Sequence, residues 1–341
     1  MQLSMITVSP STRITSSAPP DWRRLWRDAI TDSRELLDLL DLGHLASRLP
    51  AADAGFALRV PHGFATRMRK GDASDPLLLQ VLPQLAELDL VPGFVTDAVG
   101  DLASRETQGV LHKYQGRALL IASGSCAIHC RYCFRRHFPY GDEIAASNQW
   151  RQALEQVAQD KSMNELILSG GDPLALATHK LEELSRGLAD LPHVIRLRIH
   201  TRLPVVLPER IDGSFVEWLS ALPLQKVVVL HANHANEFDP AVDAACASLR
   251  DAGATLLNQS VLLRGINDTT DALVALSERM FAAGVLPYYL HQLDRVRGAA
   301  HFEVADDKAQ TLIEDMRSRL PGYLVPKLVR EVAGDPSKRP L

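Results

Sequence analysis

The chain has 341 residues, of which 46% are hydrophobic and 23% are charged, which is the balance of an ordinary globular protein. Its net charge of -4 leaves no basic footprint for nucleic acid. No apolar run approaches the ~18 residues of a membrane helix, and the N-terminus lacks the charged-then-apolar order of a signal peptide. We therefore expect a cytoplasmic protein with reduced thiols, and neither a nucleic acid nor a membrane as its partner.

The two ends of the chain differ in pattern from its centre. Residues 1–20 are rich in Ser, Thr and Pro and are expected to be disordered. Residues 21–105 are expected to form a helical N-terminal region, in which one helix runs from a cap at Asp21 to a stop at Gly43. A second helical block covers DPLLLQVLPQLAEL, and VPHGFATRMRKG connects the two. Residues 332–341 form a C-terminal tail.

From Arg117 onward, short apolar segments alternate with helical ones, which predicts β/α units and a parallel sheet over residues 106–331. The strand candidates are 117–123, 165–171, 194–201, 226–232, 255–263, 286–294 and 324–331. The predicted fold is α/β, a partial or complete (β/α) barrel, and both open and closed forms are compatible with the pattern. Active sites of such barrels lie where the strands end, and polar residues gather there: Gly170-Gly171-Asp172, His200-Thr201-Arg202, His231, Gln259 and Asp294.

Three cysteines with C-x3-C-x2-C spacing form the most informative motif. Cys126, Cys130 and Cys133 can each bind one iron of a [4Fe-4S] cluster, which normally takes four cysteines. The remaining cysteine, Cys246, lies in a helix-like run more than a hundred residues away, so one iron is left open. A structural zinc site with His129 as its fourth ligand is the alternative. Three chance core cysteines are disfavoured, because interleaved arginines leave no apolar face.

Other motifs have both a functional and an ordinary interpretation. Ser169-Gly170-Gly171-Asp172 follows a predicted strand, where paired glycines allow either close approach of a ligand or a tight turn. Arg135 is suited to binding a carboxylate beside a cluster, although a lone arginine is more often a solvated surface residue. His231 and Gln259 are weaker candidates, since both fit satisfied polar groups at strand ends.

Two carboxylates and one lysine near the C-terminus complete the candidates. Placing the carboxylates of Asp294 and Glu331 together at the rim of the barrel would cost free energy unless a cation paired with them, so together they indicate a substrate ammonium. Either one alone is compatible with a capping or surface role. Lys338 is by default a mobile tail lysine, and sequence spacing cannot establish that it reaches a cofactor.

At this point the motifs resemble those of known enzymes. The cysteine spacing, with Tyr132 before the last cysteine, resembles the signature of the radical S-adenosylmethionine (SAM) superfamily, in which SAM binds the open iron. Further stretches make the chain resemble the lysine 2,3-aminomutase family, most closely the short bacterial form of the elongation factor P modification pathway. These stretches run from about Arg59 to the C-terminus: VPHGFATRMRKGDASDPLLLQVLP, HKYQGRALLIASGSCAIHCRYCFRRHF, LSGGDPL, RIHTRLPVVLPERI, NQSVLLRGIND, QLDRVRGAAHF and PSKRPL.

The resemblance implies a role for each matching residue. It assigns the cluster to Cys126, Cys130 and Cys133, and the binding of SAM to Ser169, Gly170, Gly171 and Asp172, while His231 and Gln259 are further candidates for binding a cofactor. Arg135 would bind the substrate carboxylate, and Asp294 and Glu331 the side-chain ammonium of lysine. Pyridoxal 5'-phosphate (PLP) would be bound covalently by Lys338, with Lys113, Tyr114 and Arg117 near the cofactor and its phosphate.

The implied reaction moves the α-amino group of L-lysine to the β-carbon, giving β-lysine, after cleavage of SAM to a 5'-deoxyadenosyl radical. The implied partners are lysine and an electron donor such as a flavodoxin or ferredoxin. A functional link to the ligase that modifies elongation factor P is also implied. The alternatives are a 2,3-aminomutase for another amino acid and a non-catalytic iron-sulfur or zinc protein that binds a partner.

The chain departs from the longer members of that family at several positions. Lys113 stands where they have Arg, Glu331 where they have Asp, and DPSK replaces a glycine-rich run before Lys338. Thr269 occupies the place of a zinc-ligand cysteine, so the zinc-bearing C-terminal extension of the longer members is expected to be absent.

Overall fold

The computed structural model describes residues 21–50, 56–107, 109–142, 144–148, 150–188 and 190–341, so the predicted disorder of residues 1–20 lies outside the described residues. A single sheet of ten strands in sequence order organises the fold. Strands β3 to β9 run parallel, and they correspond to the seven predicted strands. Their bounds are Arg117–Ser123, Glu165–Gly170, Arg196–Thr201, Gln225–Leu230, Ala254–Val261, Leu286–His291 and Lys327–Arg330.

Antiparallel strands extend both edges of this parallel sheet. At one edge lie β1 (Arg105–Thr107) and β2 (Val110–Tyr114), which the sequence pattern did not predict. At the other edge, β10 (Arg339–Pro340) pairs with β9. No pairing between β1 and β10 appears in the described part of the chain, so the barrel is open.

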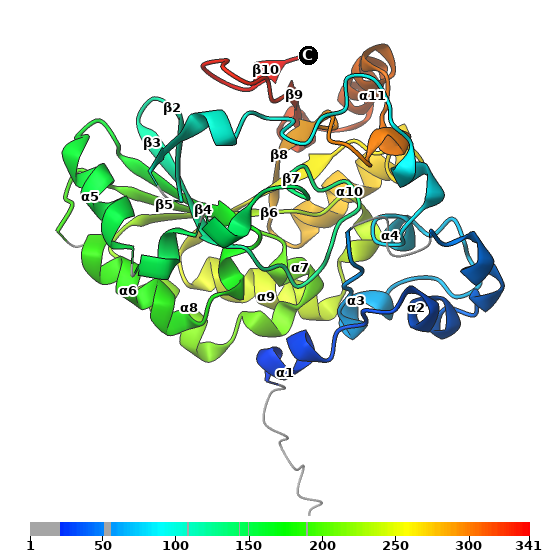
Figure 1. Ribbon diagram of the computed structural model, residues 1–341, viewed down its shortest axis with the longest axis horizontal. Helices are drawn as coiled ribbons and strands as arrows, with labels where there is room; N and C mark the ends of the chain where they lie inside the picture. The colour runs from blue at the N-terminus through cyan, green and yellow to red at the C-terminus, as the bar shows by residue number, and fades with distance from the viewer. Residues whose placement is uncertain (1–20, 51–55, 108, 143, 149, 189) are drawn as a thin grey trace, which may run out of the picture.

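Helices cover the outer face of the sheet (Figure 1). Asp212, Asp239 and Thr269 cap α8 (Gly213–Ala221), α9 (Pro240–Asp251) and α10 (Thr270–Ala282) with their side chains, as short polar residues do at helix N-termini. Strand β4 is buried along its whole length, as expected for a parallel strand covered on both faces. The helices are α5 (Arg151–Gln159), α6 (Thr178–Leu188), α7 (Leu203–Val206), α8 (Gly213–Ala221), α9 (Pro240–Asp251), α10 (Thr270–Ala282) and α11 (Asp306–Arg319).

The N-terminal region contains shorter helices than predicted. The prediction of a single helix from Asp21 to Gly43 is wrong, because the chain forms two helices, α1 (Trp22–Arg27) and α2 (Ser33–Leu39), with a non-helical link between them. Ile30 in that link pairs with Val60, and the side chain of Asp32 caps α2. Asp21 does cap α1, as predicted.

The remainder of this region is also only partly helical. The predicted connector contains α3 (His62–Ala65). The second predicted block is helical only in α4 (Pro76–Leu79) and the 3₁₀ helix η3 (Leu85–Leu88), with Pro83 between them. Leu36, Phe64 and Leu78 share one hydrophobic core with Leu166 of β4 and Val228 of β6. The N-terminal region therefore packs as part of the barrel's wall, while the predicted domain boundaries stay a prediction.

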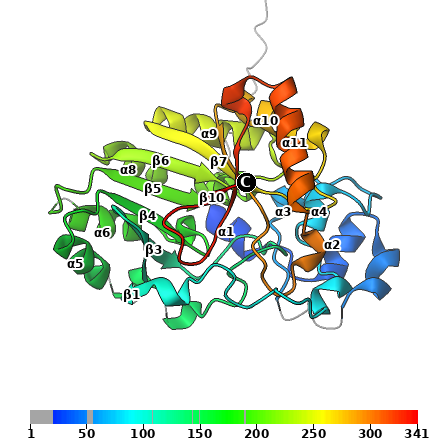
Figure 2. The ribbon, with the colours of Figure 1, turned by 90° about the horizontal axis from the view of Figure 1, so that it is seen from above.

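The C-terminal tail turns back over the open end of the barrel (Figure 2). Gly334 adopts a left-handed φ of 84°, and the amide of Asp335 donates to the carbonyl of Val332 at 3.1 Å. Arg339 then pairs with Arg330 in the sheet. This turn brings Lys338 to the end of the barrel where the parallel strands terminate.

In the described part of the chain, no helix combines the length and the apolarity that crossing a membrane requires.

Candidate active site

A cavity of about 900 Å³ lies where the parallel strands end. Its volume is at the upper end of the range for ligand sites. Every predicted site residue whose side chain the structure describes lines this cavity: Tyr114, Arg117, Cys126, Cys130, Cys133, Arg135, Ser169, Gly170, Gly171, Asp172, His231, Gln259, Asp294, Glu331 and Lys338. Lys113 lies on β2, but its side chain is outside the described part of the structure. Residues spread over most of the chain thus converge on one space.

The three cysteines lie on the loop that follows β3. Burial, and then the neighbouring thiol of Cys130, raise the pKa of Cys133 to about 11, so a bound cation is needed to hold it as a thiolate at neutral pH. Among the described residues, no three Cys, His, Asp or Glu side chains are placed to hold one metal ion. A [4Fe-4S] cluster fits better than a single zinc ion, because each thiolate then binds its own iron.

The cysteine loop is fixed to the N-terminal region by hydrogen bonds. The amides of His129 and Arg131 donate to the carbonyls of Arg59 (3.0 Å) and Gln80 (2.8 Å). Glu87 accepts hydrogen bonds from Arg131 (2.5 and 2.8 Å) and from Arg136 (2.8 Å), and these three side chains are at most 2% exposed. This buried ion-pair network was not predicted from the sequence.

Gly170 and Gly171 let β4 run directly against the start of the cysteine loop. Gly170 has φ of 121°, and a Cβ there would lie 2.5 Å from the carbonyl oxygen of Ser123. A Cβ on Gly171 would lie 2.7 Å from the carbonyl oxygen of Ser125. Both positions therefore require glycine, and they leave backbone groups beside the predicted cluster.

Asp172 has a structural task in this loop. Its carboxylate accepts hydrogen bonds from the Thr201 hydroxyl (2.7 Å) and from the amides of Arg202 (2.8 Å), Leu174 (3.0 Å) and Leu203 (3.1 Å). Burial raises the pKa of Asp172 to about 6, although these hydrogen bonds oppose the shift. The carboxylate thus ties the end of β4 to the end of β5, and its contact with SAM stays a prediction.

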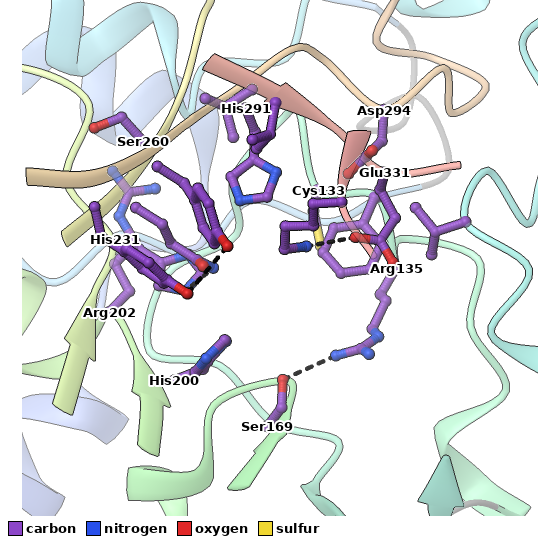
Figure 3. Close-up of a pocket in the computed structure, with 18 of the residues that line it drawn as sticks. Cys133, Arg135, Ser169, His200, Arg202, His231, Ser260, His291, Asp294 and Glu331 are labelled. Carbon is purple, nitrogen blue, oxygen red and sulfur yellow. Dashed lines mark hydrogen bonds and ion pairs between the residues drawn. The ribbon is translucent and has the colours of Figure 1, made fainter. Parts of the chain in front are cut away.

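Arg135 is buried, and Figure 3 shows Ser169 beside its guanidinium group. Its Nε donates to Asp101 Oδ2 at 2.6 Å and its Nη1 to Ser169 Oγ at 3.0 Å. No described residue accepts a hydrogen bond from Nη2, which therefore can still bind a ligand carboxylate. Asp101 was not predicted, since no motif surrounds it in the sequence.

Lys338 and Glu331 contact each other in the same cavity. Lys338 Nζ donates to Glu331 Oε2, and the Tyr114 hydroxyl donates to Glu331 Oε1 at 2.5 Å. Burial, and then this bond to Glu331, raise the pKa of Tyr114 well above its usual value. The Arg117 guanidinium lies 4.7 Å from the centre of the Tyr114 ring. Glu331, beside Asp294 (Figure 3), therefore already holds an alkylammonium in this structure.

His231 and Gln259 contact each other across neighbouring strand ends. Gln259 Nε2 donates to His231 Nε2 at 2.7 Å. Burial lowers the pKa of His231 to about 3, so the ring is neutral and can accept this bond. The sequence indicated each residue separately, and the structure makes them a pair on the cavity wall.

These features define an iron-sulfur enzyme of the radical SAM type, and comparison with known proteins agrees. The 4Fe-4S single cluster domain family matches residues 115–192. L-lysine 2,3-aminomutase of Escherichia coli (strain K12) is 50% identical over 323 residues, 94% of each chain. The protein of the same name from Haemophilus influenzae is 44% identical over 93% of this chain and 94% of its own. The chain belongs to the L-lysine 2,3-aminomutase family.

Two further proteins show a lower similarity to this chain. L-lysine 2,3-aminomutase of Clostridium subterminale is 31% identical over 94% of this chain and 77% of its own. A radical SAM methyltransferase from Sphaerobacter thermophilus has a TM-score of 0.48 at 15% identity, over 65% of this chain and 68% of that one. The predicted family, the α/β fold class and the cofactor set of [4Fe-4S] cluster, SAM and PLP are confirmed.

Proposed function

We propose that this protein moves the α-amino group of L-lysine to its β-carbon, giving β-lysine. One observation carries the proposal: a single cavity is lined both by the three cysteines and by Lys338 with Glu331. Family membership supports the same reaction, since relatives of 50% and 44% identity are named L-lysine 2,3-aminomutase. A binding protein without activity would have no use for both groups in one cavity.

The chain's own residues position the substrate between the two groups. When bound, the cluster and SAM would supply a hydrogen-abstracting radical. PLP, held by Lys338 until lysine replaces that amine, would supply the aldehyde carbon to which the substrate's amino group stays bonded as it migrates. Arg135 would bind the carboxylate of lysine through its fork. Glu331 and Asp294 would hold its side-chain ammonium, which favours lysine over acidic amino acids. Fixing both polar ends places the α- and β-carbons in the centre of the cavity and keeps water out.

Three further features belong to this proposal. An electron donor such as a flavodoxin or ferredoxin would reduce the cluster. A cytoplasmic location is supported by three cysteines that must stay reduced to bind iron. The sequence resemblance to the short bacterial form supports a role for the β-lysine in modification of elongation factor P, together with the ligase that performs it.

Turnover of the anaerobically reconstituted protein tests the proposal. With SAM, PLP, a reductant and L-lysine, we expect β-lysine to accumulate, and we expect none when SAM is omitted. L-glutamate is the matched control substrate, and it should not react because Asp294 and Glu331 would repel it. Cleavage of SAM without β-lysine would assign another substrate, and absence of both would reject the proposed function.

A further inference from the structure

Two histidines in the cavity carry ring nitrogens without partners. His200 lies on β5 and His291 is the last residue of β8, and both line the cavity. The Nε2 atoms of both are buried and have no hydrogen-bond partner among the described residues. Figure 3 shows the two rings facing the open centre of the cavity from opposite sides. Buried polar atoms in native proteins are nearly always hydrogen-bonded, so these two call for a partner.

The neighbouring His231 shows what a satisfied ring looks like in the same cavity. Its Nε2 accepts a hydrogen bond from Gln259 at 2.7 Å. No side chain of the described residues does this for His200 or His291, although His291 is only 8% exposed. The hydrogen-bond partners of these two Nε2 atoms are therefore expected to belong to a bound molecule.

The position of Lys338 indicates which molecule this is. The ring of Tyr289 lies against both groups, with its centre 5.9 Å from Lys338 Nζ and 5.5 Å from the centre of the His291 ring. The charge of Lys338 also acts on both His200 and His291. A cofactor bound covalently to Lys338 would thus lie between the two histidines.

We infer that His200 and His291 are cofactor-contacting residues that hydrogen-bond the polar edge of the PLP ring. This inference rests on the proposed function, and it adds two residues to those that family resemblance indicated for PLP. The polar edge of PLP carries a phenolic oxygen and a pyridine nitrogen, and a neutral imidazole can donate to either of them or accept from a protonated form.

Both rings are neutral in this cavity, which fits them for such contacts. Burial, and then the charge of Arg198, hold the pKa of His200 well below its usual value, with His231, Lys338 and Arg135 adding to the effect. Burial, and then the charges of Lys338 and His231, do the same for His291. Neutral imidazoles can hold the PLP ring in place without adding positive charge to a site that already contains Arg198, Lys338 and Arg135.

Binding titrations of the cluster-loaded protein test the inference. PLP affinity is followed by absorbance, and SAM affinity is measured separately by equilibrium dialysis. We expect His200→Phe and His291→Phe each to raise the dissociation constant of PLP roughly threefold to tenfold, because each loses one hydrogen bond. SAM affinity and iron content should stay unchanged. His200→Gln and His291→Gln, which keep a hydrogen-bonding group and a smaller side chain, should restore much of the PLP affinity.

His301→Phe is the matched control. Both ring nitrogens of His301 are also buried without partners among the described residues, but His301 does not line the cavity, so its variant should bind PLP normally. Unchanged PLP affinity in the His200 and His291 variants would overturn the inference, and so would weakened SAM affinity in its place. Absence of PLP binding by the unmodified protein would instead reject the proposed function. If a Phe variant fails to fold, the Gln variant at the same position is used instead. Because its amide can still form the hydrogen bond, loss of PLP affinity in the Gln variant would contradict the inference.

Discussion

Glu87→Gln tests whether the N-terminal region holds the cysteine loop in place. Glu87 and Arg131 have fully buried side chains, Arg136 is 2% exposed, and the three form three contacts of 2.5–2.8 Å including both oxygens of Glu87. Glutamine keeps the volume of the side chain but removes the negative charge that two buried guanidinium groups share. Removing one partner of a buried pair costs about 3–5 kcal/mol. We therefore expect the free energy of unfolding to fall by that amount.

The assay is urea unfolding of the cluster-loaded protein, combined with its iron content. Since Arg131 follows Cys130 directly and Arg136 lies three residues after Cys133, the variant should also lose iron faster than the unmodified protein. Glu183→Gln is the matched control, because Glu183 pairs with Lys180 at 3.0 Å in a site 26–35% exposed. That change should cost less than about 1 kcal/mol. A Glu87→Gln variant as stable and as rich in iron as the control would refute the reasoning.

Three further predictions concern the ligands of the site. Replacing any of the three cluster cysteines by alanine should abolish the iron content, whereas Cys246→Ala should retain it because Cys246 lies in the hydrophobic core; iron loss in that variant would contradict the open-iron arrangement. Asp294→Asn should raise the KM for lysine roughly tenfold to a hundredfold and leave that for SAM unchanged, while equal impairment of both would point to a structural role. Lys338→Ala should remove the absorption band of covalently bound PLP and the aminomutase activity but keep the iron and slow cleavage of SAM, and retained activity would place the PLP lysine elsewhere.

The sequence predicted the parallel part of the fold because its signals are local. The strands from β3 to β9 are short segments of continuous or alternating apolar residues, and the polar residues that follow them mark the edge where the cavity lies. The cysteine loop and Ser169 to Asp172 are continuous motifs, so their spacing alone indicated a ligand site. Their chemistry could be proposed before any contact was known.

Features that depend on distant partners could not be predicted in this way. Asp101 becomes significant only because it meets Arg135 at 2.6 Å, and Glu87 only because it meets two arginines of the cysteine loop. The break between α1 and α2 depends on the pairing of Ile30 with Val60. The helical spacing of apolar residues continues through that break, because Ile30 in the link is buried in the same core as Trp22 of α1 and Leu36 of α2.

The migration of nitrogen from the α-carbon to the β-carbon of lysine tests the central claim most directly. The substrate is L-lysine with ¹⁵N at its α-amino group, and the product of anaerobic turnover with SAM and PLP is examined by NMR spectroscopy. The account predicts β-lysine with the ¹⁵N bonded to its β-carbon. A product that has lost the label, or that keeps it at the α-carbon, would contradict the account.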